Sequence, residues 1–222
     1  MMNWNKLTIQ KDARGTLIKF WIASLLMIFL FSLIPYHLLS VILIGVTVFL
    51  MLFLAYFFRV PPRRNPKGED LVTSVADGKV VVLDKVFEDE YLKRECIQVS
   101  VYMNFFDVHT NYWPVSGEVT YYKYHPGKYA LAFLPKASEL NEHSSSCVKC
   151  HKGDIFFKQL AGTFARRIVC YSRPGMQVKR GQQGGIIKFG SRIDMYLPLD
   201  AEIKVRLGQK VKASETVIAE LK

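Results

Sequence analysis

The sequence predicts a mainly β domain of the α+β class with barrel-sandwich-like hairpins, preceded by an N-terminal two-helix transmembrane hairpin. Three observations lead to this prediction. Residues 17–58 of the 222-residue chain are almost continuously apolar. The remainder consists of short runs rich in Val, Ile, Tyr and Phe, separated by Gly or Pro. Two segments near the C-terminus resemble each other, as expected for repeated hairpins. The length leaves room for one globular domain after this apolar segment.

Residues 1–58 are predicted to anchor the chain in a membrane. Lys19 is the only Lys, Arg, Asp or Glu of the apolar segment, and a helix needs about 20 apolar residues to cross the hydrocarbon. Two spans, over 17–36 and 38–58, therefore fit as a hairpin that turns near Pro35. A secretory signal peptide is the alternative for the first span, but no small-residue cleavage site follows it and a second apolar segment comes next.

The charge pattern predicts that the domain after the hairpin lies on the cytoplasmic side of a cell membrane. Segments rich in Lys and Arg stay in the cytoplasm, and such residues flank the hairpin on both sides: Lys6, Lys11, Arg14 and Lys19 before it, and Arg59, Arg63, Arg64 and Lys67 after it. Residues 59–222 contain 26 Lys and Arg against 18 Asp and Glu, and this surplus of 8 positive charges favours docking on an anionic lipid surface. Nucleic acid is a weaker alternative, because the basic residues are scattered and no nucleic-acid-binding module is recognisable.

The cysteines are expected to be free thiols, because the cytoplasm is reducing; they are Cys96, Cys147, Cys150 and Cys170. Residues 147–151, CVKCH, match the attachment pattern of c-type haem and contain residues of the zinc-ligand type. Haem attachment takes place on the other side of the membrane, and no second cysteine pair supplies the remaining zinc ligands. The segment is therefore expected to form a hairpin that turns at 152–154, and no metal site is predicted.

Residues 59–70 have the composition of a Pro-rich linker, and 71–222 that of the β domain. Strands are expected at eight runs of the domain: 79–86, 96–103, 117–125, 154–162, 166–172, 184–190, 192–199 and 202–208. A helix is expected over 128–140, although Pro135 interrupts it.

Residues 174–187 and 207–221 share a pattern in which Val follows a Gly by three residues and a turn then leads into an Ile- or Val-containing strand. This pattern is typical of the half-hairpins of barrel-sandwich domains such as biotinyl or lipoyl carriers, where glycine permits tight turns. Neither segment carries a Lys at a hairpin tip in the context of a modified lysine. The pattern therefore predicts architecture and not a carrier function.

The pair Gly190-Ser191 lies between two predicted apolar strands. Glycine adopts backbone angles that are barred to other residues and leaves its carbonyl open to a neighbouring hydroxyl. For an isolated Gly-Ser pair, a β-bulge is the structural alternative.

The sequence resembles the short class of phosphatidylserine decarboxylase proenzymes over nearly the whole length of the chain, and several segments carry the resemblance in order. They are the apolar hairpin, Phe57-Phe58-Arg59, Ala76-Asp77-Gly78-Lys79-Val80, and residues 101–119, 134–144, 159–169 and 187–198. The resemblance implies a membrane-bound carboxy-lyase of phospholipid biosynthesis that converts phosphatidylserine to phosphatidylethanolamine and CO2. Archaetidylserine is the alternative substrate, since only the headgroup reacts.

The resemblance also implies a self-made cofactor. The Ser191 hydroxyl attacks the Gly190 carbonyl, the resulting ester undergoes β-elimination, and residue 191 becomes a pyruvoyl group with release of ammonia. The products are a β chain, 1–190, and an α chain, 191–222, that stay together as a heterodimer. The pyruvoyl group acts as the electron sink that pyridoxal phosphate provides elsewhere, so neither pyridoxal phosphate nor a metal is required.

Two further residues acquire catalytic roles from the resemblance. His109 is the candidate acid and base, since imidazole titrates near neutral pH; the alternative is a surface or core histidine. Asp77 matches the acid that orients a histidine in the longer bacterial class; the alternative is a turn aspartate before Gly. The longer class has a second histidine where this sequence has Tyr112, so the identity of the base for self-cleavage stays open.

Substrate binding is assigned to two segments. Arg166 and Arg167 are candidates for binding a phosphodiester, or are solvated charges at a strand edge. Lys136, Asn141 and Glu142 are candidates for lining the headgroup site or for ordering a lid. Two other classes of protein remain as alternatives: a membrane-tethered haem redox protein that uses the CVKCH segment, and a barrel-sandwich interaction domain without catalytic activity.

Overall fold

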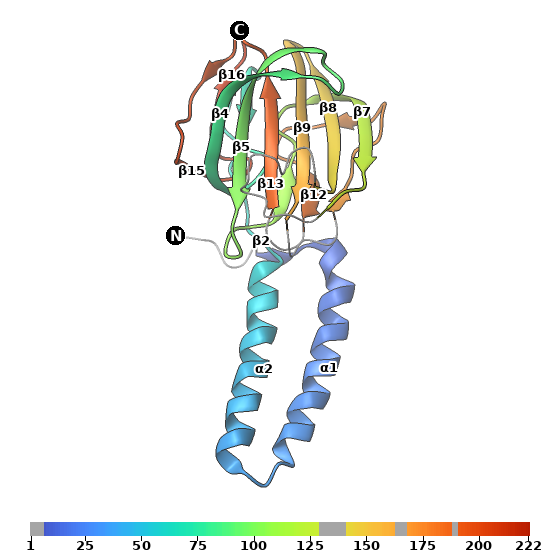
Figure 1. Cartoon of the computed structure of the whole chain (residues 1–222), viewed down its shortest axis with the longest axis vertical. Coiled ribbons are helices and arrows are strands. Elements are labelled where there is room, and N and C mark those ends of the chain that lie inside the picture. Colours follow the sequence, from blue (N-terminus) through green and yellow to red (C-terminus); the bar gives the residue numbers. More distant parts are fainter. Residues whose placement is uncertain (1–6, 129–140, 163–167, 188–190) are drawn as a thin grey trace. The chain divides into compact units, whose positions relative to one another are not determined.

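A computed structural model describes residues 7–128, 141–162, 168–187 and 191–222 (Figure 1). The chain forms two compact units, residues 1–62 and 63–222. The predicted combination of apolar helices and a mainly β domain is confirmed.

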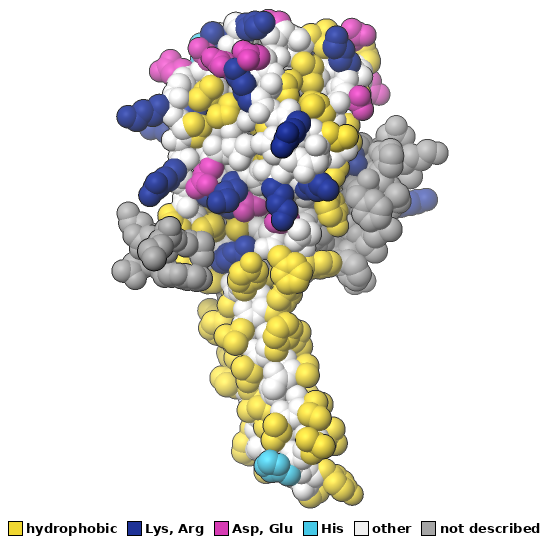
Figure 2. Space-filling model, turned by 90° about the vertical axis from the view of Figure 1, so that its left-hand side faces the viewer, with side chains coloured by type: hydrophobic (Ala, Val, Ile, Leu, Met, Phe, Trp, Pro, Cys, Tyr) yellow, Lys and Arg dark blue, Asp and Glu magenta, His cyan; other side chains and the backbone are white. Residues whose placement is uncertain are grey.

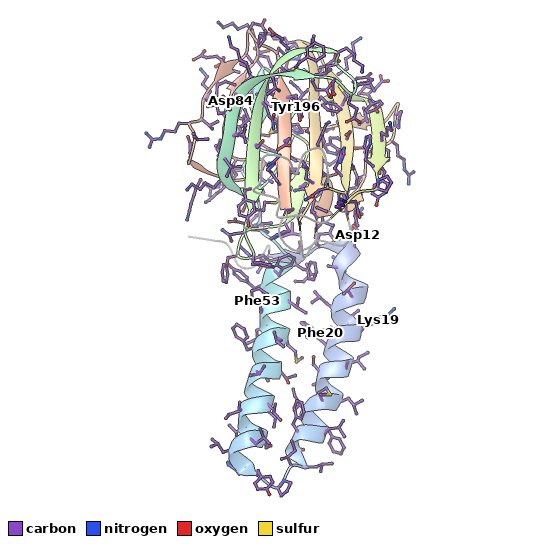
Figure 3. All side chains as sticks on the ribbon, viewed as in Figure 1. Asp12, Lys19, Phe20, Phe53, Asp84 and Tyr196 are labelled. Carbon is purple, nitrogen blue, oxygen red and sulfur yellow. The ribbon has the colours of Figure 1, made fainter. Side chains whose placement is uncertain are left out.

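The first unit contains two apolar helices, α1 (Arg14–Ser32) and α2 (His37–Phe57). By length and composition both are able to cross a membrane. Their apolar side chains point outward along their whole length (Figures 2 and 3), and Leu25 and Phe49 are 60% and 64% exposed. Such exposure on all sides suits lipid and not a water-soluble helix pair. Before and after the helices, β1 (Thr8–Ile9), a 3-10 helix (Lys11–Ala13) and β2 (Arg59–Val60) complete the unit.

The second unit is built from strands. They are β3 (Leu71–Thr73), β4 (Gly78–Glu88), β5 (Arg94–Met103), β6 (Thr110–Tyr112), β7 (Gly117–His125), β8 (His143–Cys150), β9 (Gly153–Ala161), β10 (Ile168–Cys170), β11 (Gln177–Val178), β12 (Gln183–Ile187), β13 (Ser191–Leu197), β14 (Glu202–Ile203), β15 (Lys210–Val211) and β16 (Val217–Glu220). A curled eight-stranded antiparallel sheet has the order β11-β7-β8-β9-β13-β5-β4-β15. Two three-stranded sheets, β10-β12-β6 and β14-β16-β3, complete the unit.

Strand β13 lies in the middle of the large sheet, between β9 and β5, and all of its residues are buried. Successive side chains of a strand point to opposite faces. Ile193, Met195 and Leu197 pack in the main core, whereas Tyr196 belongs to a small cluster on the other face, with Cys96, Cys147 and Phe156. On that other face Arg192 and Asp194 are also buried, and they form an ion pair with a distance of 2.7 Å between Nε and Oδ1. The strand is therefore apolar on its inner side, and its two outer charges are buried as a pair.

The two similar C-terminal segments have the same local structure. In each, a two-residue strand is followed by a turn and a longer strand: β11 and β12 in one, β15 and β16 in the other. Gly175 and Gly208 precede these pairs with φ of +84° and +81°, a conformation that a side chain would strain. The repeated pattern therefore marks repeated architecture.

The sequence did not predict the first half of strand β8. Its first half contains Ser144, Ser145 and Ser146, which are fully buried, although serine is a poor indicator of a strand. Each hydroxyl is hydrogen-bonded to another side chain, which makes their burial tolerable.

Other expected elements differ in extent. The expected helix over 128–140 lies almost wholly outside the described residues. The strand expected over 202–208 is limited to β14, and that over 166–172 is described only as β10.

Candidate active site

Several candidate residues lie at one end of the large sheet. Strand β13 begins there with Ser191, which is paired with Met103 at the end of β5 and with Ala161 at the end of β9. Strand β4 also begins at this end, directly after Asp77, and β8 begins there with His143. The antiparallel register thus gathers residues that are far apart in the sequence.

Ser191 is fully buried. Its Oγ lies 3.8 Å from Sδ of Met103, and a thioether is only a weak hydrogen-bond acceptor. The hydroxyl is therefore held weakly and is able to change partner at little cost. Gly190 lies outside the described residues.

His109 lies beside the strand that leads to Ser191. It directly precedes β6, which pairs with β12, and its carbonyl accepts a 3.4 Å hydrogen bond from the amide of Ile187, the last residue of β12. The imidazole is fully buried, and Nδ1 lies 3.0 Å from the carbonyl of Asp107. A carbonyl only accepts, so Nδ1 carries the proton and Nε2 is the basic nitrogen of the neutral ring. This is the tautomer that a general base needs.

Asp77 has partners that the sequence did not suggest. Its Oδ1 accepts a 2.7 Å hydrogen bond from Arg63 and a 2.8 Å hydrogen bond from the amide of Ala213. The Arg63 guanidinium also lies 5.8 Å from the centre of the Tyr112 ring. Burial acts to lower the pKa of Arg63, but the ion pair with Asp77 outweighs it and raises that pKa. A role for Asp77 in orienting a histidine stays a prediction.

Tyr112 occupies the position of the second histidine of the longer class. Burial raises the pKa of its hydroxyl, and the nearby Arg63 only partly opposes this effect. The phenol is therefore protonated at neutral pH and is not a general base there.

Replacing Tyr112 by phenylalanine is accordingly expected to change the rate of chain cleavage by no more than about threefold, a difference in barrier below 1 kcal/mol. Cleavage is followed on gels after synthesis of the chain is stopped. A loss of 100-fold or more would show that the hydroxyl takes part in the reaction.

Strand β9 separates Asn141 and Glu142 from Ser191. Nδ2 of Asn141 donates a 2.8 Å hydrogen bond to the carbonyl of Ala161, and the amide of Ala161 donates a 2.9 Å hydrogen bond to the carbonyl of Glu142. Ala161 is the direct partner of Ser191 in the sheet. Lys136, Arg166 and Arg167 lie outside the described residues.

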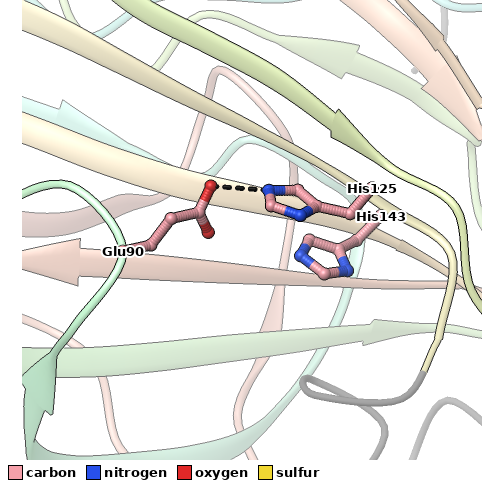
Figure 4. A group of neighbouring side chains, drawn as sticks. All are labelled: Glu90, His125 and His143. Carbon is pink, nitrogen blue, oxygen red and sulfur yellow. Dashed lines mark hydrogen bonds and ion pairs between the residues drawn. The ribbon is translucent and has the colours of Figure 1, made fainter.

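A charge cluster is centred on Glu90, and Figure 4 shows Glu90 with His125 and His143. Lys158 belongs to the cluster and follows Phe157 of the main core along β9, so its side chain points to the opposite face of the sheet. The Glu90 carboxylate lies 2.7 Å from Nε2 of His125, 2.8 Å from Nζ of Lys158 and 2.9 Å from Oγ of Ser145. The ring of His143 stacks on that of His125 at a centroid distance of 4.3 Å.

The ligand-type atoms of Glu90, His125 and His143 lie within 4.8 Å of one another, a spacing that could hold a metal ion. The Lys158 ammonium, however, is 2.8 Å from the same carboxylate, and it opposes a second cation there. The geometry favours a charge cluster over a metal site.

Replacing Glu90 by glutamine is expected to destabilise the chain at neutral pH. Burial acts to raise the pKa of Glu90, but Lys158, His125 and Ser145 outweigh it and lower this pKa from 4.5 to about 2. A lowered carboxyl pKa gives stability that is complete above pH 4.5 and is lost as the pH falls towards 2. Solvent screens part of the cluster, so we expect a loss of about 2 kcal/mol at pH 7.

The measurement is the unfolding midpoint in detergent as a function of pH, made on the uncut Ser191→Ala background. The chain that carries both Glu90→Gln and Ser191→Ala should be less stable at pH 7 than the chain that carries Ser191→Ala alone. Its stability should also vary less between pH 5 and pH 3. Parallel pH curves for the two proteins would contradict the assigned role of Glu90.

The CVKCH segment forms part of a β-hairpin, as predicted, but the turn is at His151-Lys152, between β8 and β9. The strand places Cys147 in the cluster on the outer face and Cys150 against the main core, whereas haem attachment needs both thiols on one side. Burial raises the pKa of Cys147 to about 12, so its thiol is a poor nucleophile and ligand. The haem alternative does not fit this geometry. All four cysteines are free.

A buried serine that begins a central strand and a buried histidine whose backbone carbonyl is bonded to the end of β12 define a candidate enzyme centre. Residues 50–219 match the family described as Phosphatidylserine decarboxylase. The chain therefore belongs to the phosphatidylserine decarboxylase family of carboxy-lyases. The resemblance noted in the sequence is confirmed, and the alternative of a non-catalytic interaction domain is set aside.

Three similar proteins are each named Phosphatidylserine decarboxylase proenzyme. The protein from Amoebophilus asiaticus is 48% identical over 171 residues, which cover 77% of this chain and 76% of the relative. The protein from Syntrophus aciditrophicus is 47% identical over 166 residues, 74% of this chain and 78% of the relative. The protein from Nitrosomonas europaea is 48% identical over 170 residues, which cover 76% of this chain and 78% of the relative.

Proposed function

We propose that the chain is a proenzyme that cuts itself between Gly190 and Ser191, converts Ser191 to a pyruvoyl group and decarboxylates phosphatidylserine to phosphatidylethanolamine. The observation that carries the proposal is the position of Ser191, fully buried at the start of the central strand β13. The names of the relatives support both the substrate and the proenzyme form.

In the proposed cleavage, Nε2 of His109 takes the proton of the Ser191 hydroxyl. Oγ bonds to the carbonyl carbon of Gly190, the peptide C–N bond breaks, and the amine of residue 191 is released as an ester forms. Loss of the Cα proton then breaks the Cβ–O bond and leaves a carboxylate on Gly190. Water adds to the dehydroalanine at residue 191, and ammonia departs. One histidine with a basic nitrogen suits these proton transfers.

The burial of residue 191 fits a pyruvoyl group. Ordinary hydrolysis of the peptide bond would leave a charged ammonium at a position that is 0% exposed, and burying such a charge costs several kcal/mol. A ketoacyl group is uncharged and no larger than serine. When present, this group supplies the electron sink for loss of CO2.

The sheet explains how the two cleaved chains would stay together. The proposed α chain, 191–222, contains β13 to β16. Strand β13 is paired on one side with β5 and on the other with β9, both from the proposed β chain, and β15 and β16 pair with β4 and β3. Separation would expose a buried central strand, so we expect a stable heterodimer.

Among the proposed substrate-binding residues, Asn141 and Glu142 lie at the same end of the sheet as Ser191. Lys136, Asn141 and Glu142 are proposed to line the headgroup site or to order a lid, and Arg166 and Arg167 are proposed to bind the phosphodiester. The two apolar helices would hold the domain at the membrane that contains its substrate, on the cytoplasmic side according to the flanking charges.

The test is decarboxylation by the purified full chain in detergent–lipid micelles containing phosphatidylserine labelled in the serine carboxyl group. Release of labelled CO2 with formation of phosphatidylethanolamine supports the proposal. Archaetidylserine micelles, assayed in parallel, distinguish the alternative substrate. A correctly cut chain that releases CO2 from neither lipid would contradict the proposed reaction.

A further inference from the structure

A chain of buried polar side chains ends beside Ser191 on the inner face of the large sheet. Oγ of Ser144 donates a 2.9 Å hydrogen bond to Oε1 of Gln159, and Nε2 of Gln159 donates a 2.8 Å hydrogen bond to Oδ1 of Asn111. Nδ2 of Asn111 then points at Sδ of Met103, 3.9 Å away. All of these side chains are at most 1% exposed. Burying polar side chains is costlier than burying apolar ones, so a buried polar network at this position suggests a functional role.

The donor and acceptor groups of these side chains fix the orientation of the two amides, Gln159 and Asn111. If both amides were turned round, the carbonyl oxygen of Asn111 would face the sulfur of Met103, and two acceptors would be in contact. In the observed orientation every donor meets an acceptor. Gln159 therefore fixes the Asn111 amide with its N–H bonds pointing away from β9 and toward Met103.

The side chains of Asn111 and Ser191 contact the same sulfur atom. Oγ of Ser191 lies 3.8 Å from Sδ of Met103, and Nδ2 of Asn111 lies 3.9 Å from it. An amide N–H facing a thioether makes only a weak hydrogen bond. A preorganised donor with a weak acceptor, excluded from water, is suited to bind negative charge that develops nearby during a reaction.

We propose that Asn111 is the oxyanion donor of the self-cleavage reaction. When Oγ of Ser191 bonds to the carbonyl carbon of Gly190, the π electron pair moves to the carbonyl oxygen, and the Nδ2–H of Asn111 leaves the sulfur to bond that oxyanion. Gln159 is the positioning residue that aims the amide. This inference rests on the proposed function, because it assigns a further residue to the same centre.

The backbone leaves room for this arrangement at one glycine. Gly185 on β12 is paired with Asn111, and a Cβ there would lie 3.1 Å from Nε2 of Gln159 and 2.3 Å from the carbonyl of Val169. A side chain at this position would displace the Gln159 amide. Glycine thus allows Gln159 to reach across to Asn111.

The sharpest test is Gln159→Glu, which keeps the shape of the side chain. A carboxylate has no N–H, so the Asn111 amide turns to donate to it and presents its carbonyl oxygen to Ser191. Self-cleavage should slow by about 100-fold, the usual cost of losing an oxyanion donor. Gln159→Met, which adds no charge, frees the amide without reversing it, and a loss of about tenfold is expected. Met103→Leu removes only the weak acceptor and should cut within a few-fold of the wild-type rate.

The readout is the rate at which the two shorter chains appear, together with the thermal midpoint and the pH profile of cleavage. The pH profile should keep its shape in Gln159→Met and Asn111→Leu, because these variants add no titratable group and leave the base unchanged. Gln98→Met is the matched control, since Gln98 is a buried glutamine on the outer face of the same sheet and should cut at the wild-type rate.

Folded Gln159→Met and Asn111→Leu variants that cut as fast as the wild type would overturn the inference, even if Gln159→Glu did not fold. Failure of the wild-type chain to cut would instead contradict the proposed function itself. Slow cleavage in both variants with normal thermal midpoints and an unchanged pH profile supports Asn111 as the donor.

Discussion

Replacing Ser191 by alanine is expected to leave the chain as one 222-residue polypeptide and to abolish decarboxylation. The hydroxyl is both the proposed nucleophile and the source of the pyruvoyl group, so no other atom of the side chain can substitute for it. The variant should still fold, because the hydroxyl makes a weak contact with the sulfur of Met103, 3.8 Å away. Gel analysis, the thermal midpoint and CO2 release measure the three parts of this result.

Ser100→Ala is the matched control. Ser100 is also a fully buried serine of the large sheet, but its side chain lies on the outer face and accepts a hydrogen bond from Gln98. This variant should be cut and active. A Ser191→Ala chain that still separates after residue 190 would require a different nucleophile and would contradict the account.

Replacing His109 by glutamine is expected to slow self-cleavage by a factor of about 10² to 10⁴, the range that general acid–base catalysis contributes. Glutamine is similar in size and can keep the hydrogen bond to the carbonyl of Asp107, but it has no nitrogen that accepts a proton near neutral pH. The uncut precursor should therefore accumulate in a folded form. The measurement is the fraction of precursor remaining over time after synthesis stops.

His151→Gln provides the control for this variant. His151 lies at the other end of β8, in the turn before β9, and it pairs with Asp70. Its loss should leave the cleavage rate unchanged. Equal rates for the His109 and His151 variants would show that His109 is not the base, and attention would pass to another proton acceptor.

Much of the fold could be predicted from the sequence because its signals are local. The apolar run that forms α1 and α2 has the length that a bilayer demands, and the Val- and Ile-rich runs of β4 and β5 match the strand period. The serine-rich start of β8 lacked such a signal. Its burial depends on hydrogen bonds to Gln159, Glu90 and Ser172 from distant parts of the chain.

The candidate site was only partly predictable, for a related reason. The family resemblance drew attention to Ser191 and His109. Their surroundings, with His109 bonded to the end of β12 and Ser191 paired with β5 and β9, arise from strand register, which no local pattern encodes. The pairing of Asp77 with Arg63 depends on tertiary contact. The link between Asn111 and Gln159 spans 48 positions, and a single amide in a polar segment gives no sequence signal of its own.

The central claim is that Ser191 is converted to a pyruvoyl group, and intact-mass measurement of the purified chain tests it most directly. The account predicts two polypeptides, one ending at Gly190 and one starting at residue 191. The second should be lighter than a chain beginning with serine by the mass of one ammonia. A single uncut polypeptide from active membranes, or a second chain with an ordinary serine at its N-terminus, would contradict the account.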